Sequence, residues 1–500
     1  MGVIKGQSIR YSVFNAMAIF LGAMAILFVI PYDKESYGII NTLFAAAYLL
    51  SPIIGLGLPL VIIKFHPYFI QNGKEDKYLI FALSLTAITT LSLSALLSFF
   101  YAEFASLAAF FRMDSDFLLQ YKFTIIGLAV LLVCNYVIIS FSALYKKIAI
   151  PELLSNVAYK IFVPLIVFLI YSKIMDKSWV GFGLVLFYVI STFSILTYVR
   201  NMRSWKWSLN SNDIASVNSK ELFSFLMQSG IQTLANGLIL RLDILLVGLI
   251  LGAYQAGIYG IILFMTSTLE IASKAISQIS APIISQKWAE GNVKEIEKIY
   301  GKSAVVLTVI SCLLFLLLYF NFPYIFQIMP KTEYNPDWKW VMVVLSAARI
   351  IDLGFSLNGV ILTYSKLMKY NIAFLILSGI LYFILLINLL PQLGMLGAAY
   401  SYLMVVVFFN LCKHILIKWK WNLDPINISL WKVVLMCAVG FMINYLIPVI
   451  ENPWLGMTVH SIVILICYLI LLIVLKPSED IDQTLKNTKA RLMRIMNRTL

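Results

Sequence analysis

The sequence has few charged residues for its length. Only 12% of its 500 residues are Asp, Glu, Lys or Arg, whereas 61% are hydrophobic. Soluble globular domains have about 25% charged and about 45–50% apolar residues, so this composition excludes that class. A strand-like alternation of polar and apolar residues is also lacking, which argues against an outer-membrane barrel. The chain is therefore predicted to be an all-α polytopic membrane protein.

Motifs for metal, redox and nucleotide chemistry are lacking as well. The five cysteines contain no CxxC pair and lie in apolar runs, so we expect inert buried thiols and no disulfide framework. His66, His414 and His460 are scattered, and no metal site is predicted. Gly301-Lys302-Ser303 looks like the end of a phosphate loop, but that motif requires glycine where Ile296 stands. We therefore expect no metal, no cofactor and no direct use of ATP.

Long apolar runs, separated by short polar gaps, dominate the sequence. A membrane-spanning helix needs about 20 mostly apolar residues. By this measure fourteen spans are predicted, and the first run is too long for the core of a cleaved signal peptide. The predicted spans lie near residues 9–30, 37–63, 79–101, 119–144, 150–172, 178–199, 221–251, 254–285, 303–322, 338–363, 371–390, 395–417, 429–450 and 454–475.

Positive charge is distributed unevenly among the gaps. The net charge is +14, and every second gap is rich in Lys and Arg. Such residues accumulate in the cytoplasmic loops of membrane proteins, so the asymmetry predicts a bacterial inner-membrane protein with both termini in the cytoplasm. It also argues against nucleic acid as a partner, because the charge flanks the spans on one face. The gaps on the opposite side hold only Lys34, Arg112, Lys122, Lys173, Lys177, Lys331 and Lys339.

Three pairs of short motifs indicate an internal repeat. Their members are separated by nearly constant offsets of 219, 219 and 216 residues. Six spans per repeat is an even number, so both copies insert the same way round and are related by an axis along the membrane normal. The pairs are Tyr37-Gly38-Ile39-Ile40 with Ala256-Gly257-Ile258-Tyr259-Gly260, Tyr145-Lys146-Lys147 with Tyr364-Ser365-Lys366, and Val180-Gly181-Phe182-Gly183 with Leu396-Gly397-Ala398-Ala399.

The repeat predicts how the chain divides. Residues 1–205 and 206–420 are expected to form two pseudo-symmetric six-helix bundles around a central cavity. Residues 421–476 add two extra helices. The tail at 477–500 has apolar residues near helical spacing among many basic ones, which predicts an amphipathic helix on the anionic cytoplasmic leaflet; an unstructured solvated tail is the alternative.

Four cations and three acids fall well inside the predicted spans. A charged residue that faces lipid at the bilayer centre costs roughly 2.5–3.5 kcal/mol, so these side chains must face a wet cavity or a partner. The cations exceed the acids by one, so a shared cavity would attract an anion, and arginine binds phosphate through two parallel hydrogen bonds. The cations are Lys160, Arg241, Lys274 and Arg349, and the acids are Asp243, Glu270 and Asp352.

The spacing of these residues leaves two interpretations open. Residues three or four apart share a helix face, so Glu270 and Lys274 form one potential ion pair. Arg349 and Asp352 form another. Asp243 and the arginine two residues before it point to nearly opposite faces and should not pair. The cations are candidates for substrate binding and the acids for ion coupling, whereas purely structural ion pairs are the alternative.

Two segments resemble the exporter superfamily that transports drugs, lipid-linked oligosaccharides and polysaccharides, known as the MOP superfamily. Asp243-x-Leu245-Leu246-Val247-Gly248, followed by Gly252 and Gly257-x-Tyr259-Gly260, matches its junction of spans 7 and 8. Asn388-Leu389-Leu390-Pro391, followed by Gly394 and Gly397-Ala398-Ala399, matches the junction of spans 11 and 12. With the fourteen-span plan, the resemblance covers roughly residues 8–475 and is best to flippases of polysaccharide repeat units, including O-antigen and capsule types.

The resemblance implies transport and no enzyme activity. Such a flippase would move an oligosaccharide linked to undecaprenyl diphosphate from the cytoplasmic to the periplasmic leaflet by alternating access. Its partners would be this lipid-linked oligosaccharide, membrane lipids, a polysaccharide polymerase and glycosyltransferases. The four buried cations would bind the diphosphate or acidic sugars, an assignment that follows from depth and charge only.

Three alternative functions are considered. A cation-coupled multidrug exporter would need a carboxylate deep in its first bundle to bind the coupling cation, and spans 1 to 4 contain none. A lipid II flippase is expected to have more arginine in that bundle, and spans 1 to 4 hold no mid-membrane cation. A membrane O-acyltransferase needs a buried catalytic histidine, for which His460 is the only candidate well inside a span, and it lacks an acid partner.

Overall fold

The computed structural model describes residues 2–71, 75–202 and 219–478. Within these ranges every regular element is a helix, and thirteen helices are long and apolar enough to cross a membrane. The protein is therefore an all-helical, multi-pass membrane protein, as predicted. Residues 479–500, which make up nearly all of the predicted amphipathic tail, lie outside the described residues.

Each predicted span but one coincides with a candidate membrane helix. The candidates lie between short connections, as the apolar runs indicated. They are Val13–Tyr32, Lys34–Gln71, Glu75–Phe99, Lys122–Leu144, Ala149–Tyr171, Lys177–Arg200, Lys220–Leu251, Ala253–Ala289, Val293–Ile328, Met368–Leu393, Met395–Trp421, Ile428–Tyr445 and Pro453–Leu475.

The predicted span at 338–363 is the exception. It consists of two helices, α16 (Pro336–Gly354) and α17 (Asn358–Thr363). Charged side chains occur along α16 from Asp337 to Asp352, and the helix ends before a second apolar stretch begins. The segment therefore lacks one uninterrupted apolar helix of spanning length, so the prediction of fourteen spans is confirmed for thirteen of them.

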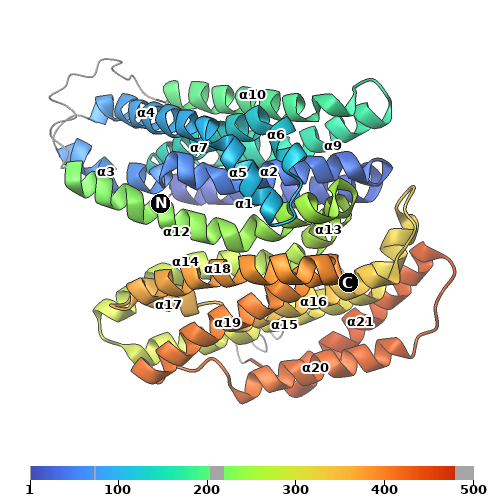
Figure 1. Ribbon diagram of the computed structural model, residues 1–500. Coiled ribbons are helices and arrows are strands. Elements are labelled where there is room, and N and C mark those ends of the chain that lie inside the picture. The colour runs from blue at the N-terminus through green and yellow to red at the C-terminus, as the bar shows by residue number, and fades with distance from the viewer. Residues whose placement is uncertain (1, 72–74, 203–218, 479–500) are drawn as a thin grey trace. The chain divides into compact units, whose positions relative to one another are not determined.

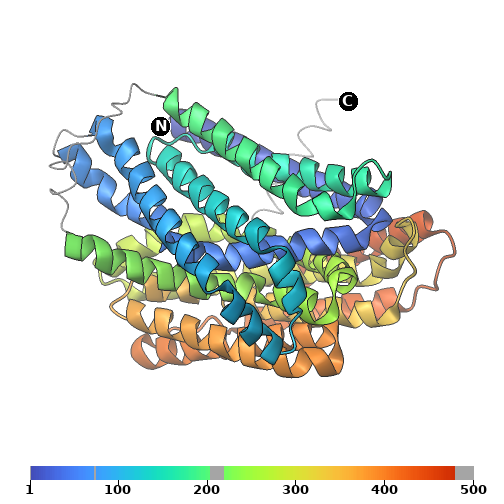
Figure 2. The same ribbon diagram turned by 45° about the horizontal axis from the view of Figure 1, so that its top comes forward.

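The first compact unit, unit 1, comprises Met1–Gly260 and Tyr382–Met395. Its central helix is α2 (Lys34–Gly55), which packs against α7 (Lys122–Leu144) and α12 (Ser219–Leu246) (Figure 1). Figure 2 shows α4 leading into α5, after which α6 turns back. The other elements are α1 (Gly2–Phe28), η1 (Ile30–Tyr32), α3 (Leu58–Gln71), η2 (Glu75–Lys77), α4 (Tyr78–Phe99), α5 (Tyr101–Phe110), α6 (Ser115–Gln120), α8 (Ala149–Glu152), η3 (Leu153–Val157), α9 (Ala158–Tyr171), η4 (Lys177–Trp179), α10 (Val180–Arg200) and η5 (Val247–Leu251).

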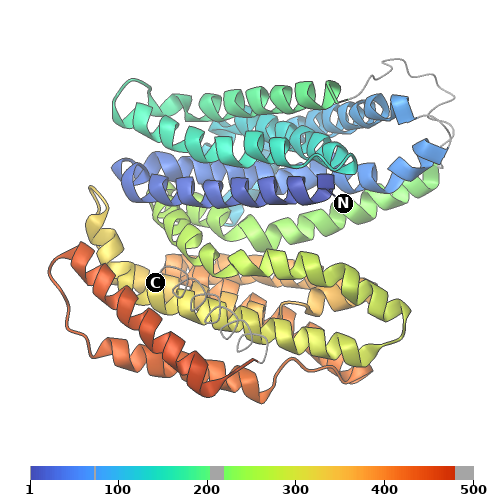
Figure 3. The ribbon, with the colours of Figure 1, turned by 180° about the vertical axis from the view of Figure 1, so that it is seen from behind.

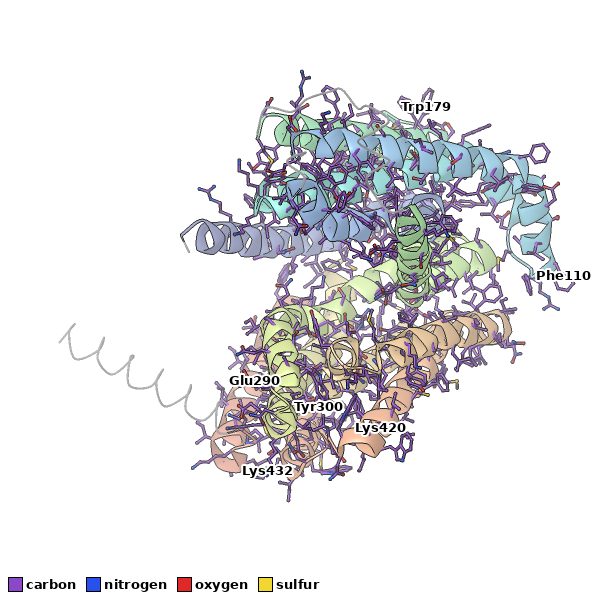
Figure 4. The ribbon with its side chains drawn as sticks, turned by 90° about the vertical axis from the view of Figure 1, so that its left-hand side faces the viewer. Phe110, Trp179, Glu290, Tyr300, Lys420 and Lys432 are labelled. Carbon is purple, nitrogen blue, oxygen red and sulfur yellow. The ribbon has the colours of Figure 1, made fainter. Side chains whose placement is uncertain are left out.

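The second compact unit, unit 2, comprises Ile261–Leu381 and Leu396–Leu500. Its longest helix, α15 (Val293–Ile328), packs against α14, α16, α20 and α21 (Figure 3). In Figure 4 the labelled Glu290, Tyr300, Lys420 and Lys432 lie on unit 2 at the end that faces the viewer. The remaining elements are η6 (Thr268–Glu270), α14 (Ile271–Ala289), α19 (Met395–Trp421), α20 (Ile428–Tyr445) and α21 (Pro453–Leu475), together with α13 (Ala253–Ser267) and α18 (Met368–Leu393), which contribute to both units. The predicted division at residues 205 and 420 and the central cavity stay predictions.

Polar caps explain where several helices begin. Asp33 accepts a hydrogen bond from the Ser36 amide at 3.0 Å at the start of α2. Asn452 accepts from the amides of Trp454 and Leu455 at 3.0 and 3.2 Å at the start of α21. Asp and Asn are preferred at this position because the first helical turn leaves its amides without backbone partners. These capping residues therefore favour helix starts in the polar gaps between the apolar runs.

Two glycines allow α2 to approach α13 closely within unit 1. A Cβ atom on Gly38 would lie 1.7 Å from the carbonyl oxygen of Ala253. A Cβ atom on Gly257 would lie 2.0 Å from the carbonyl oxygen of Lys34. At this contact backbone meets backbone, so no flexible side chain is able to yield. Gly127 on α7 is different, because a Cβ atom there would meet nothing within 4 Å.

These glycines provide a test of the packing. Gly38→Ala should lower the midpoint of thermal unfolding in detergent, because overpacking of a close contact typically costs about 1–3 kcal/mol. Gly127→Ala is the matched control and should be neutral or slightly stabilising, since helical glycine is worse than alanine by about 0.5–1 kcal/mol. Equal midpoints for the two variants would contradict the close contact.

Candidate functional site

Arg241 and Asp243, near the C-terminal end of α12, face different surroundings, as their spacing predicted. Asp243 is buried, and its carboxylate accepts hydrogen bonds from the Tyr259 hydroxyl at 3.0 Å and from the Ile244 amide at 2.8 Å. Tyr259 belongs to α13, so this acid links α12 to the next helix. The contacts of Asp243 suit a structural role, and its part in ion coupling stays a prediction.

Arg241 has aromatic rather than acidic neighbours. Its guanidinium carbon lies 5.3 Å from the ring centroid of Phe44 and 5.6 Å from that of Tyr48, both on α2. Among the residues that the structure describes, none forms an ion pair with Arg241. The faces of aromatic rings attract a cation by about 0.5–2 kcal/mol. Unlike a carboxylate, they do not satisfy its N–H groups with strong hydrogen bonds. The half-buried guanidinium therefore has N–H donors that no described carboxylate occupies.

Further rings and a second cation surround this position. The Phe44 ring centroid lies 5.6 Å from that of Tyr159 on α9 and 6.2 Å from that of Tyr188 on α10. Lys160 Nζ lies 5.8 Å from the Tyr159 ring centroid, and its charge is repelled by that of Arg241. Two like charges within electrostatic reach favour an anion between or beside them. We call Phe44, Tyr48, Tyr159, Lys160 and Arg241 the Arg241 cluster.

Both cations of the Arg241 cluster lie close to a π-helical turn. The turn η3 ends three residues before Lys160, and η5 begins six residues after Arg241. Such turns leave backbone groups that a regular helix would satisfy, and they occur frequently at functional sites. The Ser191 hydroxyl donates to the Leu154 carbonyl at 3.0 Å and so satisfies one group of η3. Nothing in the apolar periodicity of the sequence indicates these turns.

In unit 2, Glu270 pairs with a cation other than the one its spacing predicted. Its Oε1 lies 2.5 Å from Nη1 of Arg349 on α16. The expected pair with Lys274 is not formed, and Lys274 is exposed, with no ion pair or hydrogen bond to any residue that the structure describes. Contacts between helices, which spacing along one helix does not reveal, decide the partner of Glu270.

Asp352 also differs from its predicted pairing with the arginine one turn before it. The Asn410 side-chain amide donates to Asp352 Oδ1 at 2.8 Å, and the Asn358 amide donates to Asn410 Oδ1 at 2.7 Å. Both asparagines are almost fully buried. This chain of hydrogen bonds joins α16, α17 and α19 inside unit 2.

Lys413 is a buried cation that the sequence analysis did not include among the candidate site residues. It lies in α19 and is only 4% exposed. Its Nζ lies 3.6 Å from the Phe409 ring centroid, and Asp352 attracts its charge. Lys413 thus belongs to the polar interior of unit 2.

Several residues of these two sites were missed by sequence reasoning. Nothing in the sequence marks Phe44 and Tyr48 as site residues, because aromatic residues are common throughout the apolar runs. Asn358 and Asn410 were passed over because they are uncharged. One signal was available: Asn410 and Lys413 are three residues apart within a predicted span, so they share a helix face.

The fold of this chain is similar to that of several solved membrane proteins. No protein-family model matches the chain, and no curated protein matches it in sequence. The lipid II flippase MurJ in an inward closed conformation superimposes with a TM-score of 0.74 at 13% identity, over 93% of this chain and 98% of that one. An inward-facing multidrug resistance MATE transporter of the MOP superfamily gives a TM-score of 0.60 at 12% identity, over 80% of this chain and 94% of that one. A mutant of the Vibrio cholerae MATE transporter VcmN gives 0.54 at 10% identity, over 84% and 99%.

These comparisons define the class of the fold. The chain has the fold of MOP-superfamily transporters and flippases, as the resemblance of its short motifs implied. The structural neighbours are transporters and not enzymes. His460, the residue considered for acyl transfer, has the Tyr324 hydroxyl at 3.4 Å and the Phe320 ring stacked on it at 5.8 Å, and among the described residues no acid pairs with it.

The polar interior of unit 2 is open to a direct test. Asn410→Ala should reduce stability by about 1–3 kcal/mol, because Asp352 and Asn358 each lose a buried hydrogen-bond partner. Asn388→Ala is the matched control, since Asn388 is exposed and donates only to the carbonyl of Ile384 within its own helix. Thermal unfolding in detergent measures both. An Asn410→Ala midpoint equal to that of the control would contradict the buried network.

Proposed function

We propose that this protein is a flippase for saccharides linked to a polyprenyl diphosphate, working by alternating access. The observation that carries the proposal is the Arg241 cluster, in which a guanidinium inside a membrane helix rests on aromatic rings and has no described carboxylate partner. Its proposed ligand is the diphosphate, which accepts paired hydrogen bonds from arginine. The rings of Tyr48 and Tyr159 supply faces against which a sugar is able to stack.

Two observations support a flippase over a cation-coupled drug exporter. A cationic drug or a coupling ion needs an available carboxylate, and Asp243, the acid beside Arg241, is buried and hydrogen bonded. The similarity to MurJ extends over 93% of the chain, against 80% for the inward-facing MATE transporter. These residues make a site for an anion rather than for a cation.

Two substrates within the proposed class are candidates: lipid II and a lipid-linked polysaccharide repeat unit. Similarity to a lipid II flippase supports lipid II, which the sequence analysis ranked only as an alternative. The resemblance of the span junctions and the lack of a mid-membrane cation in spans 1 to 4 support a polysaccharide repeat unit. Both substrates carry the diphosphate that the Arg241 cluster is proposed to bind, so transport assays with each of them distinguish the candidates.

The membrane and the orientation of the protein are proposed from the distribution of Lys and Arg. Lys and Arg gather in every second gap, which supports insertion in a bacterial inner membrane with both termini cytoplasmic. The lipid-linked saccharide and membrane lipids are the proposed partners, and a polysaccharide polymerase and glycosyltransferases would follow if the substrate is a repeat unit.

Substitution of Arg241 tests the proposed function. Arg241→Ala should slow the flipping of a fluorescent lipid-linked saccharide in reconstituted vesicles by about tenfold to a hundredfold, because hydrogen bonds to a charged group contribute about 1.5–3 kcal/mol. Arg241→Lys should retain part of the rate, since charge remains but the paired donors are lost. The exposed Lys298→Ala serves as the control. Wild-type rates in Arg241→Ala would overturn the proposal.

The proposed orientation is tested by labelling. Single cysteines are introduced at the exposed positions Lys331 and Lys420, in a protein whose five native cysteines are replaced by serine. A membrane-impermeant maleimide added to intact spheroplasts should label Lys331→Cys and should label Lys420→Cys only after lysis, because Lys420 lies in a basic gap. The reverse pattern would contradict the cytoplasmic placement of the termini.

A further inference from the structure

The membrane helix that carries Glu270 is irregular at this residue. One turn of 3-10 helix, η6, interrupts the candidate span Ala253–Ala289. Thr266, Ser267 and Thr268 each donate a side-chain hydrogen bond to a carbonyl three or four residues earlier, at 3.0, 2.7 and 2.6 Å. Hydroxyl groups bound in this way weaken and bend helices, and a mid-helix 3-10 turn often marks a hinge.

The ion pair with α16 fixes the end of this hinge. Glu270 is the last residue of η6, and its carboxylate holds the guanidinium of Arg349 at 2.5 Å. The Glu270 side chain is 32% exposed, whereas that of Arg349 is 11% exposed. The carboxylate is therefore the outer partner and screens the arginine from an approaching anion.

A second cation follows the same carboxylate by one helical turn in the sequence. Lys274 follows Glu270 by four residues, is exposed, and forms no ion pair or hydrogen bond with the described residues. Residues in this order and spacing on a regular α-helix attract each other. If η6 relaxes to regular helix, Glu270 exchanges one cation for another and is never left alone in the membrane, where an isolated charge is costly.

We propose that Glu270 is a displaceable counter-anion: the diphosphate of the substrate takes Arg349, Glu270 moves to Lys274, and the hinge at η6 is released. This inference rests on the proposed function, because it requires a phosphate-bearing substrate. Glu270 is then a positioning residue. It pairs with Arg349 in the protein without substrate, and its release when the headgroup binds Arg349 changes the helix at η6. Lys274 acts through Glu270 and not by contact with phosphate.

Binding of inorganic pyrophosphate to the purified full-length protein tests the exchange. Glu270→Gln removes the competing charge at nearly constant size, so binding should become about tenfold tighter, which corresponds to about 1.4 kcal/mol. Glu290→Gln is the matched control, because Glu290 forms a 2.8 Å ion pair with Lys287 at the exposed end of α14. Arg349→Gln should abolish the gain from Glu270→Gln. Unchanged binding in Glu270→Gln would overturn the inference.

A double-mutant cycle separates the two roles open to Lys274. Lys274→Met should weaken pyrophosphate binding in the wild-type background, because Glu270 loses its second partner, and should have no effect in the Glu270→Gln background. A loss that persists in the Glu270→Gln background would show direct contact with phosphate and overturn the exchange.

The distance between two spin labels, at Tyr254 and Gln278, measures movement at the hinge. Both positions are exposed, and they lie on either side of η6. Pyrophosphate should shift this distance in the wild type, and Glu270→Gln should show the shifted distance without ligand. Identical distances in all states would overturn the hinge. The proposed function fails separately: a wild-type protein that flips neither lipid II nor a lipid-linked oligosaccharide refutes it, whatever the pyrophosphate results.

Discussion

The cost of charge inside a membrane helix governs the polar chemistry of this protein. A cation at mid-membrane depth must be stabilised by something other than lipid. The chain solves this problem in two ways: Arg349 is held by the carboxylate of Glu270, whereas Arg241 rests on the rings of Phe44 and Tyr48. The proposed capture of a diphosphate by Arg241 and the proposed exchange at Glu270 follow from the difference between these two environments.

The two environments differ in how readily they give way to phosphate. A ring face attracts a guanidinium through its quadrupole and remains in place when the N–H groups bind an anion. A carboxylate competes for the same N–H groups, so phosphate must displace it. In the proposed mechanism Arg241 therefore captures the headgroup first. Binding at Arg349 is then coupled to movement of the helix that bears Glu270.

The sequence sufficed for thirteen of the fourteen predicted spans, and it failed where partners on other helices decide. Apolar run length depends on local composition, so thirteen predicted spans coincide with candidate membrane helices. Spacing along one helix suggested Lys274 for Glu270, but the contact between α16 and η6 brings Arg349 instead. Lys413 shows the same limit, because its position near the end of a predicted span gives no sign of Asp352, which lies on a distant segment. Spacing along one helix therefore does not predict which charges meet.

Helix irregularities explain why the polar residues are found where they are. The turns η3, η5 and η6 lie within a few residues of Lys160, Arg241 and Glu270. Backbone groups released inside a membrane must be satisfied by nearby side chains, and Ser191 and Thr268 do so for η3 and at η6. Hydroxyl groups thus lie beside the charges near η3 and η6. Regular apolar helices would be more stable but would neither redirect a side chain nor bend.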